Sequence, residues 1–247
     1  MQDSYSALVA RKSESGTEGK VLSLEHEHRS TAELPSDEIV VEVEYSSLNY
    51  KDALVMSGAP GLCREYPRVP GIDAAGRVHR GDGKEFVTGQ PVLITGFDFG
   101  VNHDGGYQRL CSAPAEWVLH RPEKMGAHDA MLVGTAGLAA GLSVQELLDA
   151  GVSPSDGPVL VTGATGGVGS CAVAILAGIG FSVTALTRKP DGERMLKSLG
   201  AREVISPDEL GLESSRPMEK SRWAAVVDQV GGQVLEAAIR QTQYGGT

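Results

Sequence analysis

The sequence predicts an α/β protein of two domains, a β-rich domain followed by one in which strands and helices alternate around a parallel sheet. The first half contains short runs of alternating apolar and polar residues, separated by turns rich in glycine and aspartate. Near Asp129 the composition changes to an Ala- and Leu-rich stretch, and from Val159 onward apolar strands alternate with helical segments. We therefore place the two domains at residues 1–128 and 129–247.

The clearest strand of the first domain is Ile39 to Tyr45, in which Ile39, Val41, Val43 and Tyr45 share one face. This period of two is typical of a half-buried strand. Further short strands are expected at Gln90–Thr95 and Tyr107–Cys111. A compact β barrel or sandwich follows, with a mobile polar turn at Arg11–Lys20.

The second domain begins with a helical segment at residues 130–151, and Gly151 followed by Pro154 predicts its end. The alternation that follows favours parallel strands joined by crossover helices. The expected strands are Val159–Thr162, Ser182–Thr187, Glu203–Ile205 and Ala224–Asp228, and the expected helices are Gly167–Ala177, Glu193–Leu199 and Gly232–Thr242.

A glycine-rich motif, Thr162-Gly-Ala-Thr-Gly-Gly-Val-Gly169, joins the first of these strands to its helix. Its glycines allow a tight turn, let backbone N–H groups approach a pyrophosphate and let the helix pack closely on the strand. Ala164 is a tolerated departure from the G-x-G-x-x-G pattern. The strand-turn-helix context favours a dinucleotide site over a turn that binds no ligand.

The end of the second strand, Thr187-Arg-Lys189, predicts which nicotinamide cofactor is used. An NAD site has Asp or Glu there to bind the ribose 2′-OH. This chain has no acid at that point, and Thr187, Arg188 and Lys189 supply a hydroxyl and two cations that suit a 2′-phosphate. NADPH is the predicted cofactor, and a solvated basic turn is the alternative.

Four strands are assigned in the second domain, whereas a complete dinucleotide-binding sheet has about six in the order 3-2-1-4-5-6. We therefore expect this domain to be incomplete at the C-terminus, after Tyr244–Thr247, with its fourth strand as an open edge. Low stability or aggregation is the expected result. A monodisperse preparation that melts cooperatively would contradict that expectation.

Charge and composition exclude several classes of partner. The 22 basic and 32 acidic residues give a net charge of −10, which repels nucleic acid and anionic membrane surfaces. No signal peptide and no stretch of about 18 apolar residues is recognised. The cysteines Cys63, Cys111 and Cys171 are far apart, which favours a reducing compartment over a disulfide framework or a zinc knuckle. We expect a cytoplasmic protein with no nucleic-acid or membrane partner.

The order of motifs along the chain resembles the medium-chain dehydrogenase/reductase superfamily. The motifs are Ser46-Ser-Leu-Asn-Tyr-Lys-Asp52, Val69-Pro-Gly-Ile-Asp-Ala-Ala-Gly76, Gly134-Thr-Ala-Gly137 and the glycine loop. The first two are most similar to the zinc-independent, quinone oxidoreductase-like YhdH/AcuI subgroup, the NADPH-dependent acryloyl-CoA reductases. The resemblance covers nearly the whole chain. It implies a GroES-like catalytic domain, then a Rossmann-type NADP-binding domain, NADPH in the cleft between them, and a homodimer for a complete chain.

The resemblance also implies which residues form the site. Asn49, Tyr50 and Lys51 are the catalytic candidates. The expected cofactor-binding residues are Tyr50, Thr135, Gly163, Thr165, Gly166, Gly167, Val168, Gly169, Thr187, Arg188 and Lys189. From the residues alone, Tyr50 is equally a half-buried core or interface aromatic and Asn49 a satisfied turn residue.

Zinc is not expected, because zinc-dependent relatives carry Cys and His ligands near these segments. This chain has Asn49-Tyr50 and Ile72-Asp73 there instead. Its histidines show no ligand spacing and are expected at the surface or in loops: His26, His28, His79, His103, His120 and His128.

Together these features predict NADPH-dependent reduction of the carbon–carbon double bond of acryloyl-CoA or a similar α,β-unsaturated carbonyl substrate. Hydride addition leaves negative charge on the carbonyl oxygen, and Tyr50, Lys51, the cofactor ribose hydroxyl and backbone N–H groups are the candidates to stabilise it. A CoA substrate also needs cations, for which Lys51, Arg64 and Arg68 are candidates. The alternatives are reduction of quinones or small enones, and NADPH binding without catalysis.

Overall fold

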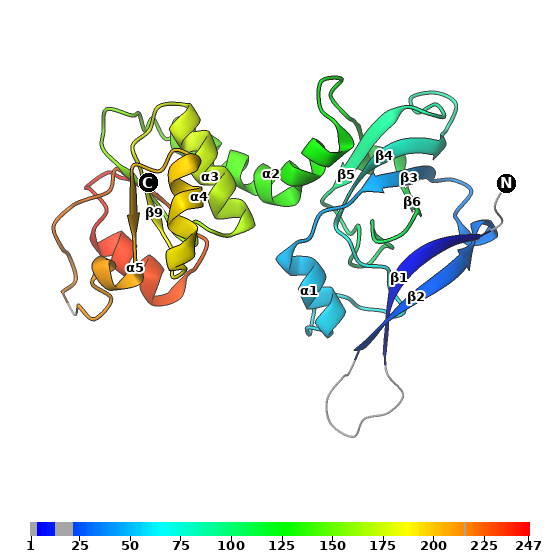
Figure 1. The fold of residues 1–247 in the computed structure, drawn as a ribbon, viewed down its shortest axis with the longest axis horizontal. Helices are drawn as coiled ribbons and strands as arrows, with labels where there is room; N and C mark the ends of the chain where they lie inside the picture. The colour runs from blue at the N-terminus through cyan, green and yellow to red at the C-terminus, as the bar shows by residue number, and fades with distance from the viewer. Residues whose placement is uncertain (1–3, 13–21, 215) are drawn as a thin grey trace. The chain divides into compact units, whose positions relative to one another are not determined.

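The computed structural model describes residues 4–12, 22–214 and 216–247, which divide into two compact units, Met1–Thr135 and Ala136–Thr247. The first unit consists mainly of antiparallel strands and the second is a parallel sheet covered by helices (Figure 1). The division falls inside helix α2 (Ala127–Asp149), between Thr135 and Ala136 and one residue beyond Gly134. The sequence predicts this boundary between residues 128 and 129. Of the turn expected at residues 11–20, Arg11 and Lys12 belong to a strand and the remainder lies outside the described residues.

The first unit contains a five-stranded antiparallel sheet in the order β6-β3-β4-β5-β7 and a two-stranded hairpin, β1-β2. Successive side chains of a strand point to opposite faces, so the two faces of a strand pack against different neighbours. Ile39 and Val41 of β3 face the main core, whereas Val40 points the other way and packs against Tyr5 of β1. The start of β3 is therefore buried on both faces, not half-buried as the alternation predicted. The bounds are β1 Ser4–Lys12, β2 Leu22–Ser30, β3 Ile39–Tyr45, β4 Asp73–Arg80, β5 Pro91–Thr95, β6 Leu110–Ala113 and β7 Val118–His120.

One short α-helix, α1 (Tyr50–Ser57), carries two of the predicted catalytic residues, and the sequence did not predict it. The Asn49 N–H at its start donates to Asp52 Oδ2 at 2.8 Å, which caps the first turn. Gly58, with φ 71°, ends the helix in the left-handed conformation that glycine favours. Two 3₁₀ turns complete the unit, η1 (Thr31–Glu33) and η2 (Ala115–Trp117).

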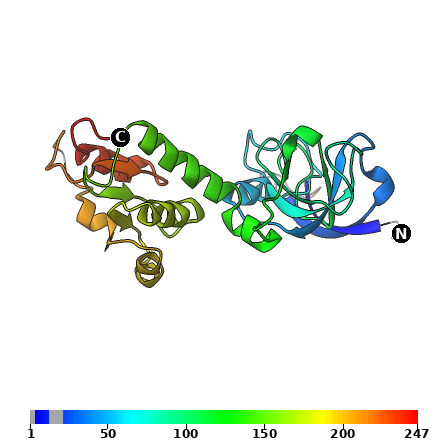
Figure 2. The same cartoon turned by 90° about the horizontal axis from the view of Figure 1, so that it is seen from above.

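The second unit contains a four-stranded parallel sheet in the order β10-β9-β8-β11, which is the 3-2-1-4 part of the expected order. Val159 and Val161 of β8 face the helices α2, α3 and α4, whereas Leu160 faces α5 on the other side. Figure 2 shows α3 and α5 on opposite sides of the sheet. The bounds are β8 Val159–Val161, α3 Gly167–Gly178, β9 Val183–Leu186, η3 Pro190–Gly192, α4 Glu193–Ser198, β10 Glu203–Ile205, η4 Pro207–Leu210, β11 Ala225–Val227 and α5 Gly232–Arg240.

The expected open edge at the fourth strand is paired at one point. Thr247 N–H donates to Ala224 O at 3.4 Å, and Val226 N–H donates to Thr247 O at 2.8 Å. These two bonds follow the pattern of a parallel ladder. The outer side of β11 is therefore hydrogen-bonded near its start.

Helix α2 is long and apolar enough, by length and composition alone, to cross a membrane, a stretch that the sequence was expected to lack. Gly134, with φ 47° and ψ −157°, breaks the helix. Beyond the break, Val144 and Leu147 pack in the core of the second unit, while Leu138 and Leu142 are exposed. The second part of α2 is thus a helix that covers one face of the sheet.

Candidate functional site

The glycine loop follows β8, and two of its glycines are required by geometry. Gly163 has φ 57°, in the left-handed region that other residues rarely adopt. A Cβ at Gly169 would lie 2.5 Å from Gly163 O and 2.8 Å from Ala164 Cα. Only glycine allows the helix to approach the loop this closely, as the sequence predicted.

The N-terminus of α3 offers backbone donors. The first N–H groups of a helix have no partner within that helix and carry its positive dipole end. Gly166 precedes α3, and no side chain caps this end in the part of the chain that the structure describes. The Gly166 N–H already donates to Gly163 O at 2.9 Å, whereas Gly167 is exposed and Val168 is half-buried, so an anion can reach the amides of these two residues.

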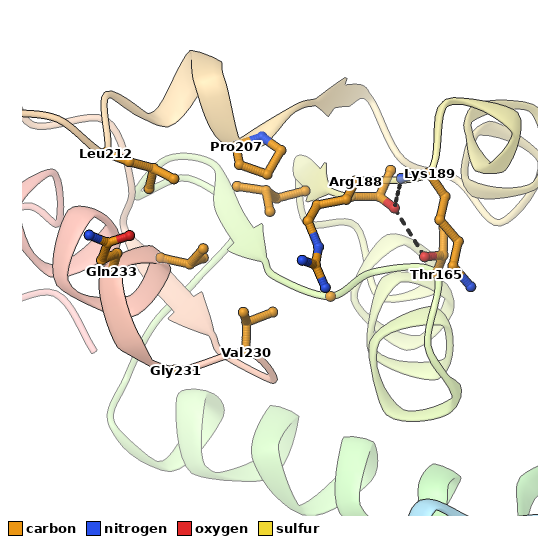
Figure 3. Close-up of a pocket in the computed structure, with 12 residues that line it drawn as sticks. Thr165, Arg188, Lys189, Pro207, Leu212, Val230, Gly231 and Gln233 are labelled. Atoms are coloured by element: carbon orange, nitrogen blue, oxygen red, sulfur yellow. Dashed lines mark hydrogen bonds between the residues drawn. The ribbon is translucent and has the colours of Figure 1, made fainter.

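A cavity of about 410 Å³ opens beside this loop within the second unit. In Figure 3 the Arg188 side chain points into it, with Pro207 and Val230 on its two sides. None of the described residues that line it is acidic. They are Gly163, Thr165, Leu186, Thr187, Arg188, Lys189, Pro207, Leu212, Val230, Gly231, Gln233 and Val234.

Thr187 fixes the turn that carries the two cations. Its hydroxyl lies 3.0 Å from Thr165 Oγ1 and accepts a bond from Lys189 N–H at 3.1 Å. Arg188 and Lys189 are exposed, and they also line a second hollow of about 430 Å³. Cations beside a cavity without acids fit a 2′-phosphorylated nucleotide, and the structure brings them together with Thr165 of the glycine loop.

The first unit contains a hydrogen-bonded centre around Asp73, which is fully buried. Its carboxylate accepts five hydrogen bonds and has no cation among its donors. Oδ1 accepts from Thr95 Oγ1 at 2.7 Å and Thr135 Oγ1 at 2.6 Å; Oδ2 accepts from Ser47 Oγ, from Asn49 Nδ2 at 2.9 Å and from Thr135 N at 2.9 Å.

These donors determine the charge state of Asp73. Burial by itself would raise the pKa of this carboxyl, but the bonds from Ser47, the Thr135 amide and the Thr135 and Thr95 hydroxyls hold the pKa below its ordinary value. Asp73 is therefore an anion near neutral pH. Its acceptor positions are occupied, so it holds its neighbours in place.

The predicted residues Asn49, Tyr50, Lys51 and Thr135 lie in the first unit, and Asp73 joins two of them. Asn49 Nδ2 donates to Asp73 and to Ser47 Oγ at 2.9 Å, so Asn49 is a satisfied residue as the alternative expected. Tyr50 is 81% exposed and does not lie in the core of this unit. Lys51 is exposed beside it.

Asp52 is a second buried carboxylate that the sequence did not single out. It accepts from Gly71 N at 3.1 Å, Ile72 N at 2.9 Å and Tyr107 Oη at 3.1 Å, besides the helix cap. These bonds join α1 to the segment that leads into Asp73. Asp52 and Asp73 both lie in the motifs on which the family resemblance rests, and their place in those motifs could have identified them as site residues.

Some of the other expected positions differ in the structure. Arg68, a candidate for binding CoA, bonds to Asp104 at 3.2 Å with its side chain 15% exposed, whereas Arg64 is exposed. His103 lies in a loop, as expected, and is half-buried with its Nε2 3.0 Å from Glu38 Oε1. Among residues 4–12, 22–214 and 216–247, no three His, Cys, Asp or Glu side chains are grouped to hold a metal ion.

Two family models match the chain, one in each part. Residues 35–123 match the alcohol dehydrogenase GroES-like domain, and residues 167–247 match the domain described as zinc-binding dehydrogenase. These matches agree with the β-rich first unit and the parallel sheet of the second. The expected GroES-like and Rossmann-type fold class is confirmed.

The chain is 43% identical to acrylyl-CoA reductase AcuI of Ruegeria pomeroyi, over 98% of this chain and 73% of the relative. It is 39% identical to the putative quinone oxidoreductase YhfP of Bacillus subtilis, over 100% of this chain and 73% of that protein. The structure of YhfP with NAD bound superposes with a TM-score of 0.91 at 40% identity, covering 98% of this chain and 72% of that one.

The yhdH oxidoreductase of Salmonella enterica, solved in complex with NADP, superposes with a TM-score of 0.90 at 41% identity. That match covers 98% of this chain and 72% of the other. Sequence and fold agree along nearly all of the chain. The chain belongs to the YhdH/AcuI group of the medium-chain dehydrogenase/reductase superfamily.

Proposed function

We propose that this chain is an NADPH-dependent oxidoreductase that reduces the carbon–carbon double bond of an α,β-unsaturated thioester such as acryloyl-CoA. The choice of NADPH as the cofactor rests on one observation: a cavity without acidic residues lies beside the glycine loop, and Arg188 points into it. The name of the Ruegeria pomeroyi relative supports the substrate class.

The cofactor is held by residues of the second unit. The amides of Gly167, Val168 and Gly169 at the start of α3 bind the pyrophosphate, because they present unpaired donors at the positive end of the helix. Arg188 and Lys189 bind the 2′-phosphate, and Thr187 keeps their turn in place. When bound, NADPH supplies the hydride for the reduction.

The first unit supplies hydrogen-bond donors for the substrate. Negative charge develops on the carbonyl oxygen as the β-carbon is reduced, so a positioned donor there lowers the barrier. Tyr50 and Lys51 are exposed and free to act as such donors. Asn49 acts as a positioning residue, because its amide already donates to Asp73 and Ser47.

The polar centre of the first unit does not fit zinc. Structural and catalytic zinc sites use thiolates, imidazoles and available carboxylates. The groups around Asp73 are hydroxyls and an amide, and the single carboxylate already accepts five hydrogen bonds. A zinc-free reduction is therefore the proposal, with Tyr50 and Lys51 in the role that a metal would have at the carbonyl oxygen.

The test is acceptor-dependent oxidation of NADPH, followed by the loss of reduced-nicotinamide absorbance, with acryloyl-CoA, a quinone or no acceptor. The Ruegeria pomeroyi enzyme serves as the positive control. Oxidation fastest with acryloyl-CoA supports the proposal. Binding of NADPH without oxidation of any acceptor would overturn it in favour of a cofactor-binding protein.

A quinone or small enone is the second candidate, because the chain is also 39% identical to a protein named as a putative quinone oxidoreductase. The same donors and cofactor site would permit that reaction. A higher kcat/KM for the quinone than for acryloyl-CoA would support this second candidate.

We also propose a cytoplasmic location and, for a chain as long as its relatives, a homodimer. The location is supported by the cysteines Cys63, Cys111 and Cys171, which form no disulfide in the structure. Cell fractionation tests the location, and light scattering of a chain extended to the length of the relatives tests the dimer.

A further inference from the structure

Two side chains that the proposed function does not use meet where the sheet changes direction. Thr162 follows β8 and Asp228 follows β11, and these strands are neighbours in the order β10-β9-β8-β11. From β8 the chain passes to β9 and β10 on one side and returns to β11 on the other. Open parallel sheets bind ligands at the carboxyl ends of their strands at such a reversal.

Thr162 and Asp228 are joined by a chain of hydrogen bonds that continues into the loop after β11. Thr162 Oγ1 donates to Asp228 Oδ1 at 2.6 Å and accepts from Gln229 N–H at 2.9 Å. Asp228 Oδ2 accepts from Gly231 N–H at 2.8 Å. Two of the four amides in residues 229–232 are therefore held by this pair, and Thr162 is fully buried.

The loop that the pair holds forms one wall of the cavity. Val230 and Gly231 line it, and Val230 is 49% exposed although it is apolar. The space between Val230 and the glycine loop is small, because a Cβ at Gly163 would lie 3.2 Å from Val230 Cγ2. A shift of the loop by about an ångström would therefore change the shape of the cavity wall that Val230 and Gly231 form.

We propose that Thr162 and Asp228 are positioning residues for the cofactor: their hydrogen-bonded pair fixes residues 229–231 as the wall of the cavity against which the nucleotide binds. The choice of NADPH as the ligand rests on the proposed function. The pair acts through the loop and does not itself touch the ligand. Loss of the pair is therefore expected to raise the Kd for NADPH. A variant that only lowers the stability of the unit is expected to leave this Kd unchanged.

The test compares three threonine variants of the full chain. Thr162→Val keeps the shape of the side chain but leaves Gln229 N–H without its acceptor and Asp228 Oδ1 without the donor that Thr162 supplies. Thr162→Ser restores the hydroxyl. Thr184→Val is the matched control, because Thr184 is also buried in this sheet and donates to Glu203 at 3.3 Å, and it lines neither hollow.

Two quantities are measured for each variant: the Kd for NADPH by titration, and the hydrogen exchange of the Gln229 and Gly231 amides without ligand. Thr162→Val is expected to raise the Kd about tenfold and to speed exchange at both amides, while Thr162→Ser stays within about threefold of the parent. Thr184→Val lowers the melting temperature and leaves the Kd and both amides unchanged. If Thr162→Val does not fold, Asp228→Ala, which removes the acceptor of the Gly231 N–H and of the Thr162 hydroxyl, is expected to raise the Kd and to speed exchange at Gly231.

An unchanged Kd in Thr162→Val, or a Kd that rises equally in Thr184→Val, would overturn the inference. If the parent chain does not bind NADPH at all, the proposed function fails separately. The exchange data then still decide whether the pair fixes the loop: faster exchange at Gln229 and Gly231 supports it, and unchanged exchange sinks it.

Discussion

The two units treat buried and exposed charge in opposite ways. In the first unit, the carboxylates of Asp52 and Asp73 are fully buried and accept hydrogen bonds from backbone and side-chain donors. In the second unit, the amides at the start of α3 and the cations Arg188 and Lys189 face open space. The anions of the first unit are hydrogen-bonded within the protein, and the donors of the second unit are accessible to an anionic ligand.

That difference separates scaffold from ligand site. A buried carboxylate whose acceptor positions are filled has nothing left to offer a substrate, but it fixes every group that donates to it. Unpaired amides and cations beside a cavity can form hydrogen bonds and ion pairs with the phosphate of a ligand. We therefore expect substitutions at the buried carboxylates of the first unit to change stability, and substitutions at the cations beside the cavity of the second unit to change nucleotide affinity.

The largest expected effect comes from Asp73→Asn. The amide nitrogen would face donors such as Thr135 N–H, and the remaining bonds would lose their charge. The free energy of unfolding is expected to fall by about 3 kcal/mol. Urea denaturation measures this, and Asp37→Asn, at an exposed aspartate, is expected to change it by less than about 0.5 kcal/mol. Equal effects of the two variants would break the comparison.

The next effect is expected at Arg188→Ala in the second unit. Loss of one charge-assisted bond should raise the Kd for NADPH about 10- to 100-fold and change that for NADH little, because NADH has no 2′-phosphate. Arg194→Ala removes an exposed arginine of α4 that lines neither hollow and is the control. The comparison is wrong if Arg188→Ala lowers the free energy of unfolding and changes the Kd values for NADPH and NADH by the same factor.

A smaller effect is expected from acid. The pKa of Asp73 lies below its ordinary value in the folded chain, so the folded state binds fewer protons at this group than the unfolded state does. Its stabilisation is complete above about pH 4 and is lost as the pH falls through the folded-state pKa. The difference in unfolding free energy between parent and Asp73→Asn should therefore shrink below about pH 4. A difference that grows with acid would show that Asp73 is not held as an anion.

The smallest effect is expected at Tyr107→Phe. The Tyr107 hydroxyl donates to Asp52 at 3.1 Å, and burial, together with that carboxylate, raises the pKa of Tyr107. Asp52 keeps its backbone donors when the hydroxyl is lost. We expect a loss of about 1 kcal/mol in unfolding free energy, with Tyr244→Phe, at a fully exposed tyrosine, as the control. A loss as large as that of Asp73→Asn would mean that Asp52 depends on this one donor.

The same contrast explains what the sequence could predict. Strands β3 and β10 begin and end at the predicted residues, and the glycine loop lies where its motif placed it. Periodicity and glycine spacing are local signals, and the glycine loop and the Thr187–Lys189 turn are each short segments that such signals can identify.

The centre of the first unit could not be derived in this way. Asp73 accepts from Thr135, 62 positions later, and from Asn49, 24 positions earlier, and no local pattern specifies such partners. The break in α2 was missed for the same reason, because Gly134 lies in a run with continuous helical spacing. Helix α1 is only eight residues long, and its hydrophobic pattern is too short to identify it.

The glycine at the break in α2 makes two distant positions depend on each other. Gly134 has φ 47°, and a Cβ there would lie 2.7 Å from Asp73 Oδ2. An alanine at 134 is therefore opposed both by its backbone conformation and by a carboxylate that cannot move without releasing its donors. Substitutions at positions 73 and 134 should be strongly non-additive, so the residue that either position tolerates is set by the residue at the other.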